Sequence, residues 1–383
     1  MIAINQLGFG AVMPVLALFA RSFGVSQSAI GLAIAIYGLA RFLLAVPGGR
    51  LADRIGRRGA LALGCLVTAL GNLLCALAPT YAAFAGARFV AGAGAALVLT
   101  TGVIVLADIT TPADRGRTMS IYQGVFLFAV GVGPYPGGLL AEHFGLRAPF
   151  WVYAVAGALA AALTWICVPD TRNWRARDDI AAAPPFASQL RLLAGRRGFL
   201  LVSLVSFINA VARTGALFNV VPVLAHDRLD LATDQIGVGL ALASIVGLAF
   251  AYPAGVMVDR YGRKIVIVPS TITAGAALVV FVVAPSYAWF LAGCVAWSVA
   301  AGVSGAAPAA YAADVAPPGM NAAAMSAYRM LSDLGYVAGP ITLGIATDLA
   351  GANATLAVTA LALAAVALLF AWRAPETHAG ARV

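Results

Sequence analysis

The chain has 383 residues, of which 62% are hydrophobic and only 10% are charged, and its formal net charge is +9. Because a soluble domain carries roughly 25% charged residues, this composition excludes an ordinary water-soluble protein and predicts that a lipid bilayer surrounds most of the chain. The basic excess would suggest nucleic acid in a soluble protein. Here the basic residues lie in short turns between apolar runs, so we expect no nucleic-acid partner.

Spanning the hydrocarbon of a bilayer takes about 20 apolar residues as a helix. Twelve runs in this chain satisfy that length. In chain order, they are 2–20, 29–48, 60–78, 81–106, 118–141, 148–168, 198–224, 235–257, 265–284, 286–312, 320–344 and 352–373. The chain opens almost directly into the first run without a basic leader, so we expect a membrane helix there and no cleaved signal peptide.

One long polar segment separates the sixth run from the seventh. It carries six arginines and an adjacent pair of prolines, which predicts a linker with one amphipathic helix near Phe186–Leu193 on the membrane surface. The expected domains are a six-helix bundle, a cytoplasmic linker, a second six-helix bundle and a cytoplasmic tail. They cover residues 1–168, 169–197, 198–373 and 374–383.

The loops on the two sides of the predicted bundle differ in basic residues. Seventeen lysines and arginines fall on the side of the linker and the chain ends, and three, Arg21, Arg147 and Arg228, fall on the other. Because cytoplasmic loops carry the excess of Lys and Arg, we expect both termini in the cytoplasm of a cell whose plasma membrane holds the chain. The Ala- and Arg-rich composition, with a single lysine, suggests a bacterial inner membrane.

One stretch of fourteen residues occurs twice. GGRLADRIGRRGAL runs from Gly48 to Leu61, and AGVMVDRYGRKIVI runs from Ala254 to Ile267, 206 positions later. The same offset relates Pro79 to Pro285, Tyr81 to Tyr287, Asp108 to Asp314, and Gly133-Pro134 to Gly339-Pro340. A unit repeated in one register, with a basic turn between apolar segments in each copy, predicts two pseudo-symmetric bundles of the kind that form membrane transporters.

The first basic turn resembles the G-x-L-A-D-R-x-G-R-[RK] loop signature of the major facilitator superfamily. The matching residues are Gly49, Leu51, Ala52, Asp53, Arg54, Gly56, Arg57 and Arg58. The resemblance covers nearly the whole chain, and a degenerate second copy, here from Gly255 to Lys264, is also expected of the family. It implies an all-α polytopic membrane protein with twelve transmembrane helices in two six-helix bundles.

The same resemblance implies a gate on the cytoplasmic side. Asp53 would latch the two halves together in the outward-open state, with Arg57, Asp108 and Arg115 as its partners. An anion at a helix end can pair with arginines or face the positive N-terminus of another helix, and Gly56 permits a tight turn. The alternative is that the basic residues of the turn only enforce topology.

Residues 133–138 read GPYPGG and resemble the G-P-x-x-G-G signature of the drug:proton antiporter branch of the family. The matching residues are Gly133, Pro134, Gly137 and Gly138. The fuller signature has glycines where this chain has Ser120 and Ala129, so the match is partial. Glycines let helices approach closely and prolines bend them, so tight packing without a coupling role is the alternative.

Five charged residues stand out well inside the predicted spans: Arg41, Arg88, Arg213, Arg329 and Asp333. A charge near the bilayer centre costs at least about 2.5–3.5 kcal/mol, so each needs a partner, water or a function. Arg329 and Asp333 are four residues apart and share a helix face, whereas their counterparts in the first copy are uncharged. We predict a substrate or ion pathway there, with Asp333 as the first candidate proton carrier; a structural ion pair is the alternative.

Arg88 begins the sequence RFVAGAG, which resembles the R-x-x-x-G-x-G signature linked to proton transfer in the family; its counterpart is Cys294. Related antiporters often carry an acidic residue in the first or fourth helix, but the first helix here offers only Asn5 and Gln6. Arg41 and Arg213 could line the pathway, or else snorkel or bond backbone carbonyls. The excess of arginines over Asp333 favours anionic or neutral substrates.

The sequence therefore predicts a monomeric secondary active transporter that moves a small organic molecule by alternating access, with proton-coupled efflux as the leading hypothesis. The alternatives are an uptake permease or facilitator for an organic anion or sugar, and a non-transporting membrane receptor or scaffold. We expect no enzyme, metal or cofactor, because no catalytic triad, metal spacing or phosphate loop is present. The four cysteines, which lie in apolar runs, are expected to be buried; they are Cys65, Cys75, Cys167 and Cys294.

Overall fold

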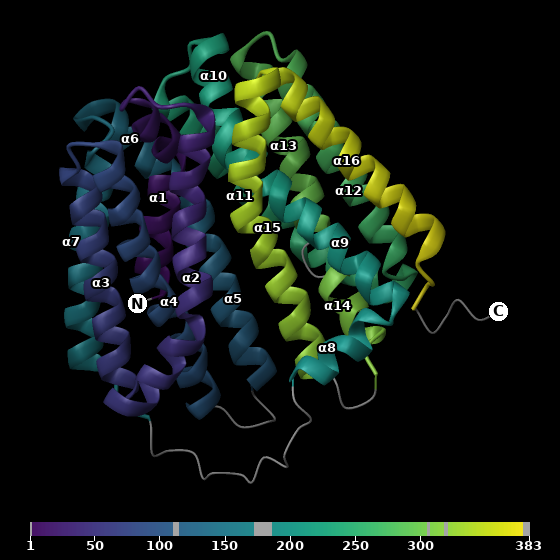
Figure 1. The fold of residues 1–383 in the computed structure, drawn as a ribbon, viewed down its shortest axis with the longest axis horizontal. Helices are drawn as coiled ribbons and strands as arrows, with labels where there is room; N and C mark the ends of the chain where they lie inside the picture. Colours follow the sequence, from purple (N-terminus) through teal and green to yellow (C-terminus); the bar gives the residue numbers. More distant parts are fainter. Residues whose placement is uncertain (1, 110–114, 172–185, 305–306, 318–320, 378–383) are drawn as a thin grey trace. The chain divides into compact units, whose positions relative to one another are not determined.

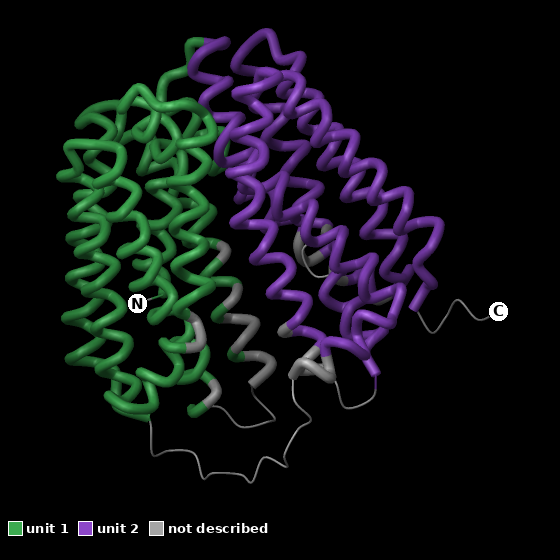
Figure 2. Tube along the Cα trace, viewed as in Figure 1, with its two compact units in different colours: residues 1–179, 230–241 green, residues 180–229, 242–383 purple. Residues whose placement is uncertain are grey.

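The structure, a computed structural model, describes residues 2–109, 115–171, 186–304, 307–317 and 321–377 (Figure 1). Within these residues every regular element is a helix. The chain divides into two compact units, Met1–Asp179 with Asp230–Ala241 and Ile180–Leu229 with Leu242–Val383 (Figure 2).

As far as the structure describes it, the first unit is built from seven helices and the first turns of an eighth. They are α1 (Ile2–Arg21), α2 (Gln27–Ile55), α3 (Arg57–Leu77), α4 (Tyr81–Ile109), α5 (Arg115–Val132), α6 (Pro134–Phe144), α7 (Ala148–Cys167) and the start of α11 (Thr233–Tyr261). The break between α5 and α6 falls at Gly133, immediately before Pro134, whose ring cannot donate a backbone hydrogen bond. The two helices together take the place of the predicted run 118–141.

The second unit begins with α8 (Phe186–Ala194), the helix predicted in the linker. The others are α9 (Arg197–Val211), the π-helix η1 (Ala212–Val220), α10 (Val221–Leu229), the rest of α11, α12 (Lys264–Val283), α13 (Tyr287–Ser304), α14 (Ala307–Asp314), α15 (Asn321–Ala350) and α16 (Ala352–Arg373). The π-helix was not expected from the sequence. Such elements are rare and occur mostly as short bulges within α-helices, frequently at functional sites.

Eleven stretches of the described helices are long and apolar enough to cross a membrane. The thirty-residue α15 is not among them, and it occupies the predicted run 320–344 and carries Arg329 and Asp333. With α15, the spans agree with the predicted twelve-helix membrane fold. Cys167, the last residue of α7, is exposed, which corrects the expectation that all four cysteines are buried, because the helix ends there.

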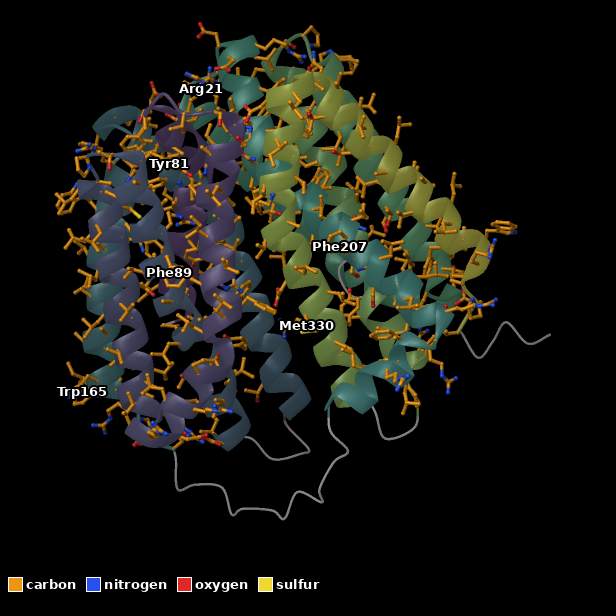
Figure 3. The ribbon with its side chains drawn as sticks, in the orientation of Figure 1. Arg21, Tyr81, Phe89, Trp165, Phe207 and Met330 are labelled. Atoms are coloured by element: carbon orange, nitrogen blue, oxygen red, sulfur yellow. The ribbon has the colours of Figure 1, made fainter. Side chains whose placement is uncertain are left out.

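Small residues allow the helices of each unit to touch at their backbones. A Cβ added to Gly10 of α1 would lie 2.5 Å from the carbonyl oxygen of Val130 in α5. In the second unit a Cβ on Gly335 of α15 would lie 2.6 Å from the carbonyl oxygen of Phe207 in α9, a residue labelled in Figure 3. Such close approach compensates for the lack of a hydrophobic driving force between helices in lipid.

Candidate functional site

Arg57, at the start of α3, joins three elements of the first unit. Its Nε donates to Asp108 Oδ2 of α4 at 3.0 Å, and its Nη1 donates to Asp53 Oδ1 of α2 at 2.6 Å and to the carbonyl oxygen of Ala52 at 3.1 Å. The Asp108 side chain is 6% exposed, whereas that of Asp53 is 67% exposed. The structure thus brings together three of the predicted gate residues.

The chain that follows α7 closes this network. The backbone N–H of Arg57 donates to Asp170 Oδ1 at 2.9 Å, and Thr171 Oγ1 donates to Asp108 Oδ2 at 3.0 Å. Asp170 therefore places a carboxylate at the N-terminus of α3, where the helix dipole favours negative charge. Gly56 has φ of +86°, and a Cβ there would collide with the Asp170 carboxylate, so both backbone and space call for glycine.

The second unit repeats most of this network, with each described member 206 positions later; the side chain of Asp259, the counterpart of Asp53, lies outside the described residues. Arg263 Nε lies 2.9 Å from Asp314 Oδ2 in an ion pair, and Arg263 Nη1 donates to the carbonyl oxygen of Val258 at 3.1 Å. The backbone N–H of Arg263 donates to Glu376 Oε1 at 3.2 Å, and Thr377 Oγ1 donates to Asp314 Oδ2 at 2.9 Å. Gly262, at φ of +100°, stands where Gly56 stands in the first copy.

The next basic residue of each turn also binds the end of the last helix in its unit. Arg58 Nε donates to the carbonyl oxygen of Val168 at 2.9 Å, and Lys264 Nζ donates to that of Ala374 at 2.7 Å. A cation at the C-terminus of a helix is favourable for the same dipole reason. The guanidinium of Arg58 also lies 5.9 Å from the ring of Trp165, labelled in Figure 3.

Sequence reasoning missed four members of these networks: Asp170, Thr171, Glu376 and Thr377. A signal for them exists, because the tripeptides Pro-Asp-Thr and Pro-Glu-Thr, at 169–171 and 375–377, follow the last helix of each copy at the same offset. Of the other gate residues, Gly49 is half-buried in α2 and Arg54 is exposed. Arg115 begins α5, and its side chain lies outside the described residues.

Arg88 of α4 is buried, with 1% of its surface exposed. Its Nε lies 3.5 Å from the carbonyl oxygen of Ala33, and its guanidinium carbon lies 4.4 Å from the centre of the Tyr37 ring. Among the described residues no carboxylate forms an ion pair with it. Phe89, the next residue along α4, is labelled in Figure 3.

The other predicted charges inside the spans are less buried. Arg41 is half-buried on α2. Arg213 lies in the π-helix η1, half-buried, with its guanidinium 5.9 Å from the ring of Phe218. Arg329 and Asp333 are both exposed on α15 and lie one turn apart. The residues between them are Met330, labelled in Figure 3, Leu331 and Ser332.

The GPYPGG segment makes close backbone contacts within the first unit. A Cβ on Gly133 would lie 2.6 Å from the carbonyl oxygen of Leu7, and one on Gly137 would collide with the backbone of Ala11. Gly138 faces the first turn of α11, since a Cβ there would lie 2.7 Å from the carbonyl oxygen of Thr233. These contacts explain why the first turns of α11 group with this unit.

Within the described part of the chain, no group of three or more His, Cys, Asp or Glu side chains is placed to hold a metal ion.

Residues 1–233 and 202–382 match the sequence profile of the Major Facilitator Superfamily. The chain belongs to that superfamily. It is a membrane transporter and not an enzyme.

Relatives within the superfamily match over most of this transporter's length. An uncharacterized MFS-type transporter of Methanocaldococcus jannaschii is 22% identical over 350 residues, which cover 91% of this chain and 89% of that protein. The class C tetracycline resistance protein of Escherichia coli is 30% identical over 268 residues, 69% of this chain and 67% of that protein. The crystal structure of a human organic anion transporter superposes with a TM-score of 0.68 and 21% identity over 96% of both chains, a likeness of fold.

Proposed function

We propose that this superfamily member is a secondary active transporter that exports a small organic molecule in exchange for protons by alternating access. The observation that supports it best is the charged network that recurs in the two units. Each copy ties together the turn between two helices, the end of the next helix and the segment after the last one. Such ties let each unit move as a rigid body, which alternating access requires.

Asp53 is the proposed cytoplasmic latch. Two carboxylates pair with the Arg57 guanidinium, and the side chain of Asp53 is 67% exposed whereas that of Asp108 is 6% exposed. An exposed carboxylate can exchange partners during a conformational change at little cost, because surface ion pairs are worth about 0–1 kcal/mol. A buried one cannot, since breaking a buried pair leaves an unpaired charge. Asp108 therefore suits a fixed role and Asp53 a switching role.

Asp333 is the proposed proton carrier. It is exposed on α15, one turn from Arg329, and the two corresponding residues of the first copy carry no charge. A fold shared by both copies does not need this pair, whereas proton coupling needs a group that gains and loses a proton. Export is supported by the similarity to a tetracycline resistance protein, because a transporter confers resistance by keeping a compound out of the cell.

We further propose a monomer in a bacterial inner membrane with both termini in the cytoplasm. The support for this orientation is the distribution of basic residues between the two sides of the predicted bundle. Uptake or facilitated diffusion of an organic anion or sugar is the second candidate. The observation that favours it is the number of arginines within the predicted spans, Arg41, Arg88, Arg213 and Arg329, against the single carboxylate of Asp333.

Reconstituted protein tests the proposal. Proteoliposomes with an imposed proton gradient are offered a panel of fluorescent organic compounds, and the flux of each is followed with and without the gradient. We expect at least one compound to be driven by the gradient, and Asp333→Asn to abolish that drive while exchange of compound across the membrane persists. The matched control is Asp348→Asn, an exposed aspartate near the end of the same helix.

Three outcomes contradict parts of the proposal. Gradient-driven flux that is unchanged in Asp333→Asn removes Asp333 as the carrier. Flux that ignores the gradient in the wild type favours the facilitator. No flux of any compound, from protein that is folded and inserted, favours the receptor or scaffold.

A further inference from the structure

The first unit contains a buried group of polar and aromatic side chains around Arg88, which we call the Arg88 cluster. Its members come from four helices and are Phe9 of α1, Tyr37 of α2, Arg88 of α4 and Tyr153 of α7, and we add Asn5, which lies one turn before Phe9 on the same face of α1. Arg88, Tyr37, Tyr153 and Asn5 are 1%, 5%, 1% and 2% exposed. The cluster therefore places a full positive charge in the interior of a membrane-spanning bundle.

The charge of Arg88 is poorly compensated within the described residues. A guanidinium has five N–H donors, but Arg88 has one hydrogen bond, a long one to Ala33, and one contact with the face of the Tyr37 ring. No carboxylate in the described part of the chain pairs with it. Buried charges are normally paired and hydrogen-bonded, so the unmet donors point to an anion as the missing partner.

The surroundings of Arg88 supply further polar groups and apolar walls. The Tyr153 side chain is next to that of Tyr37, and Phe9 stacks on Tyr37 with 5.4 Å between ring centres. Asn5 lies one helical turn before Phe9, and its Oδ1 has no hydrogen-bond partner among the described residues. Because an amide can rotate to present its NH₂ group, Asn5 can donate to an anion as the tyrosine hydroxyls can.

The repeat shows that the fold does not require this cluster. The counterparts of Tyr37, Arg88 and Tyr153 in the second copy are the small residues Ala243, Cys294 and Thr359. Cys294 is fully buried, so a small neutral side chain fills the corresponding position of the same architecture. A charge that is costly in lipid and dispensable for packing is retained in one copy only, which argues for a role in binding.

We propose that the Arg88 cluster binds the carboxylate group of the transported molecule. This inference rests on the proposed function in one respect, because it takes the bound molecule to be the one that is transported. One carboxylate balances the one uncompensated charge. Its two oxygens match the planar fork of the guanidinium, and Phe9 and Tyr37 offer flat apolar walls to the organic part of the acid. Since Arg88 is 1% exposed and its guanidinium lies against the Tyr37 ring, the proposal requires that ring to move aside for the acid to enter.

Binding by purified full-length protein tests this proposal without a gradient or flux. The probes are matched acid and amide pairs, benzoate with benzamide and nicotinate with nicotinamide, at constant ionic strength, with chloride and nitrate as inorganic anions. Dissociation constants come from the concentration dependence of the thermal unfolding midpoint. We expect at least one acid to bind about tenfold or more tightly than its amide, the size expected of a charge-assisted pair.

Variants assign that preference to Arg88. Arg88→Gln is expected to bring the acid-to-amide ratio close to one, and Arg88→Lys, which keeps the charge but loses the fork, to lower it several-fold. Arg191→Gln removes an equal charge from the exposed face of α8 and is expected to leave the ratio unchanged. If Arg88→Gln does not fold, Arg88→Lys decides, and a ratio equal to that of the wild type then overturns the assignment.

Other results also overturn the proposal. The first is that no acid binds more tightly than its amide in any pair. The second is that the acid still binds more tightly than its amide in Arg88→Gln. The third is that chloride or nitrate raises the unfolding midpoint of the protein and the organic acids do not. The outcome is separable from that of the transport experiment. An acid preference that depends on Arg88 stands even if the proton gradient drives no export, in which case direction and coupling are wrong and the binding site is right.

Discussion

The side chain of Arg57 contacts two carboxylates that differ greatly in exposure, so the strengths of two ion pairs can be compared at one guanidinium. Asp108 is 6% exposed and Asp53 is 67% exposed. The corresponding carboxylate of the second unit, Asp314, pairs with Arg263 and is 30% exposed. The three pairs have similar distances, and burial is the main difference between Asp108 and Asp53.

The expected magnitudes follow from that burial. Removing one partner of a buried pair costs about 3–5 kcal/mol, whereas an exposed pair contributes about 0–1 kcal/mol. We expect a coupling energy of about 2–3 kcal/mol between Arg57 and Asp108, because the pair is close to but not fully buried. For Arg57 and Asp53 we expect less than about 1 kcal/mol, and for Arg263 and Asp314 an intermediate value.

Double-mutant cycles with alanine measure these energies. The unfolding of each single and double variant is followed by circular dichroism in mixed micelles titrated with a denaturing detergent, and the coupling is the departure from additivity. The reasoning is refuted if the Asp53 and Asp108 couplings are equal, or if that of Asp53 is the larger. Either result would mean that burial does not set the strength of this network.

Three further predictions concern single positions. Gly56→Ala should destabilise the protein more than Gly24→Ala does. Both glycines have positive φ, but only at Gly56 would the added Cβ collide with a carboxylate. The thermal unfolding midpoints of the two variants test this difference. Gly137→Leu should abolish transport or folding, because even a Cβ at this position collides with the α1 backbone. Gly86→Leu, at a position with open space around it, should leave both intact. Substrate flux and the monodispersity of the purified protein distinguish the two variants. Cys167 should react with a maleimide in the folded protein, and reaction of a second cysteine before unfolding would contradict the burial of Cys65, Cys75 and Cys294.

The membrane spans could be predicted because they depend on local properties. A run of about 20 apolar residues is read directly from the chain, and bilayer thickness requires nothing else. The repeat is equally readable, and it anticipated that Arg57 and Arg263, and Asp108 and Asp314, would be equivalent. The amphipathic α8 followed from its own composition. Prediction failed for Cys167, where the end of α7 decides exposure.

Contacts between distant segments could not be predicted in the same way. Asp170 was read as part of a polar linker, yet its carboxylate accepts a hydrogen bond from Arg57, 113 positions earlier in the chain. The π-helix at Ala212–Val220 has no signature in its own residues, and Gly215 within it packs against the backbone of Gly339 in α15. Both features depend on which helices become neighbours.

The sequence by itself determined that this protein is embedded in a membrane, that its helical bundle is duplicated and that its basic turns lie at equivalent positions of the two copies. These properties could be read because hydrophobicity and periodicity are carried by consecutive residues. Only the tertiary structure decided which charges are paired. It gave Arg57 two carboxylates and Arg88 an aromatic ring. The physical reason is that the energy of a charge depends on the groups within a few ångströms of it, and packing of separate helices alone selects those groups.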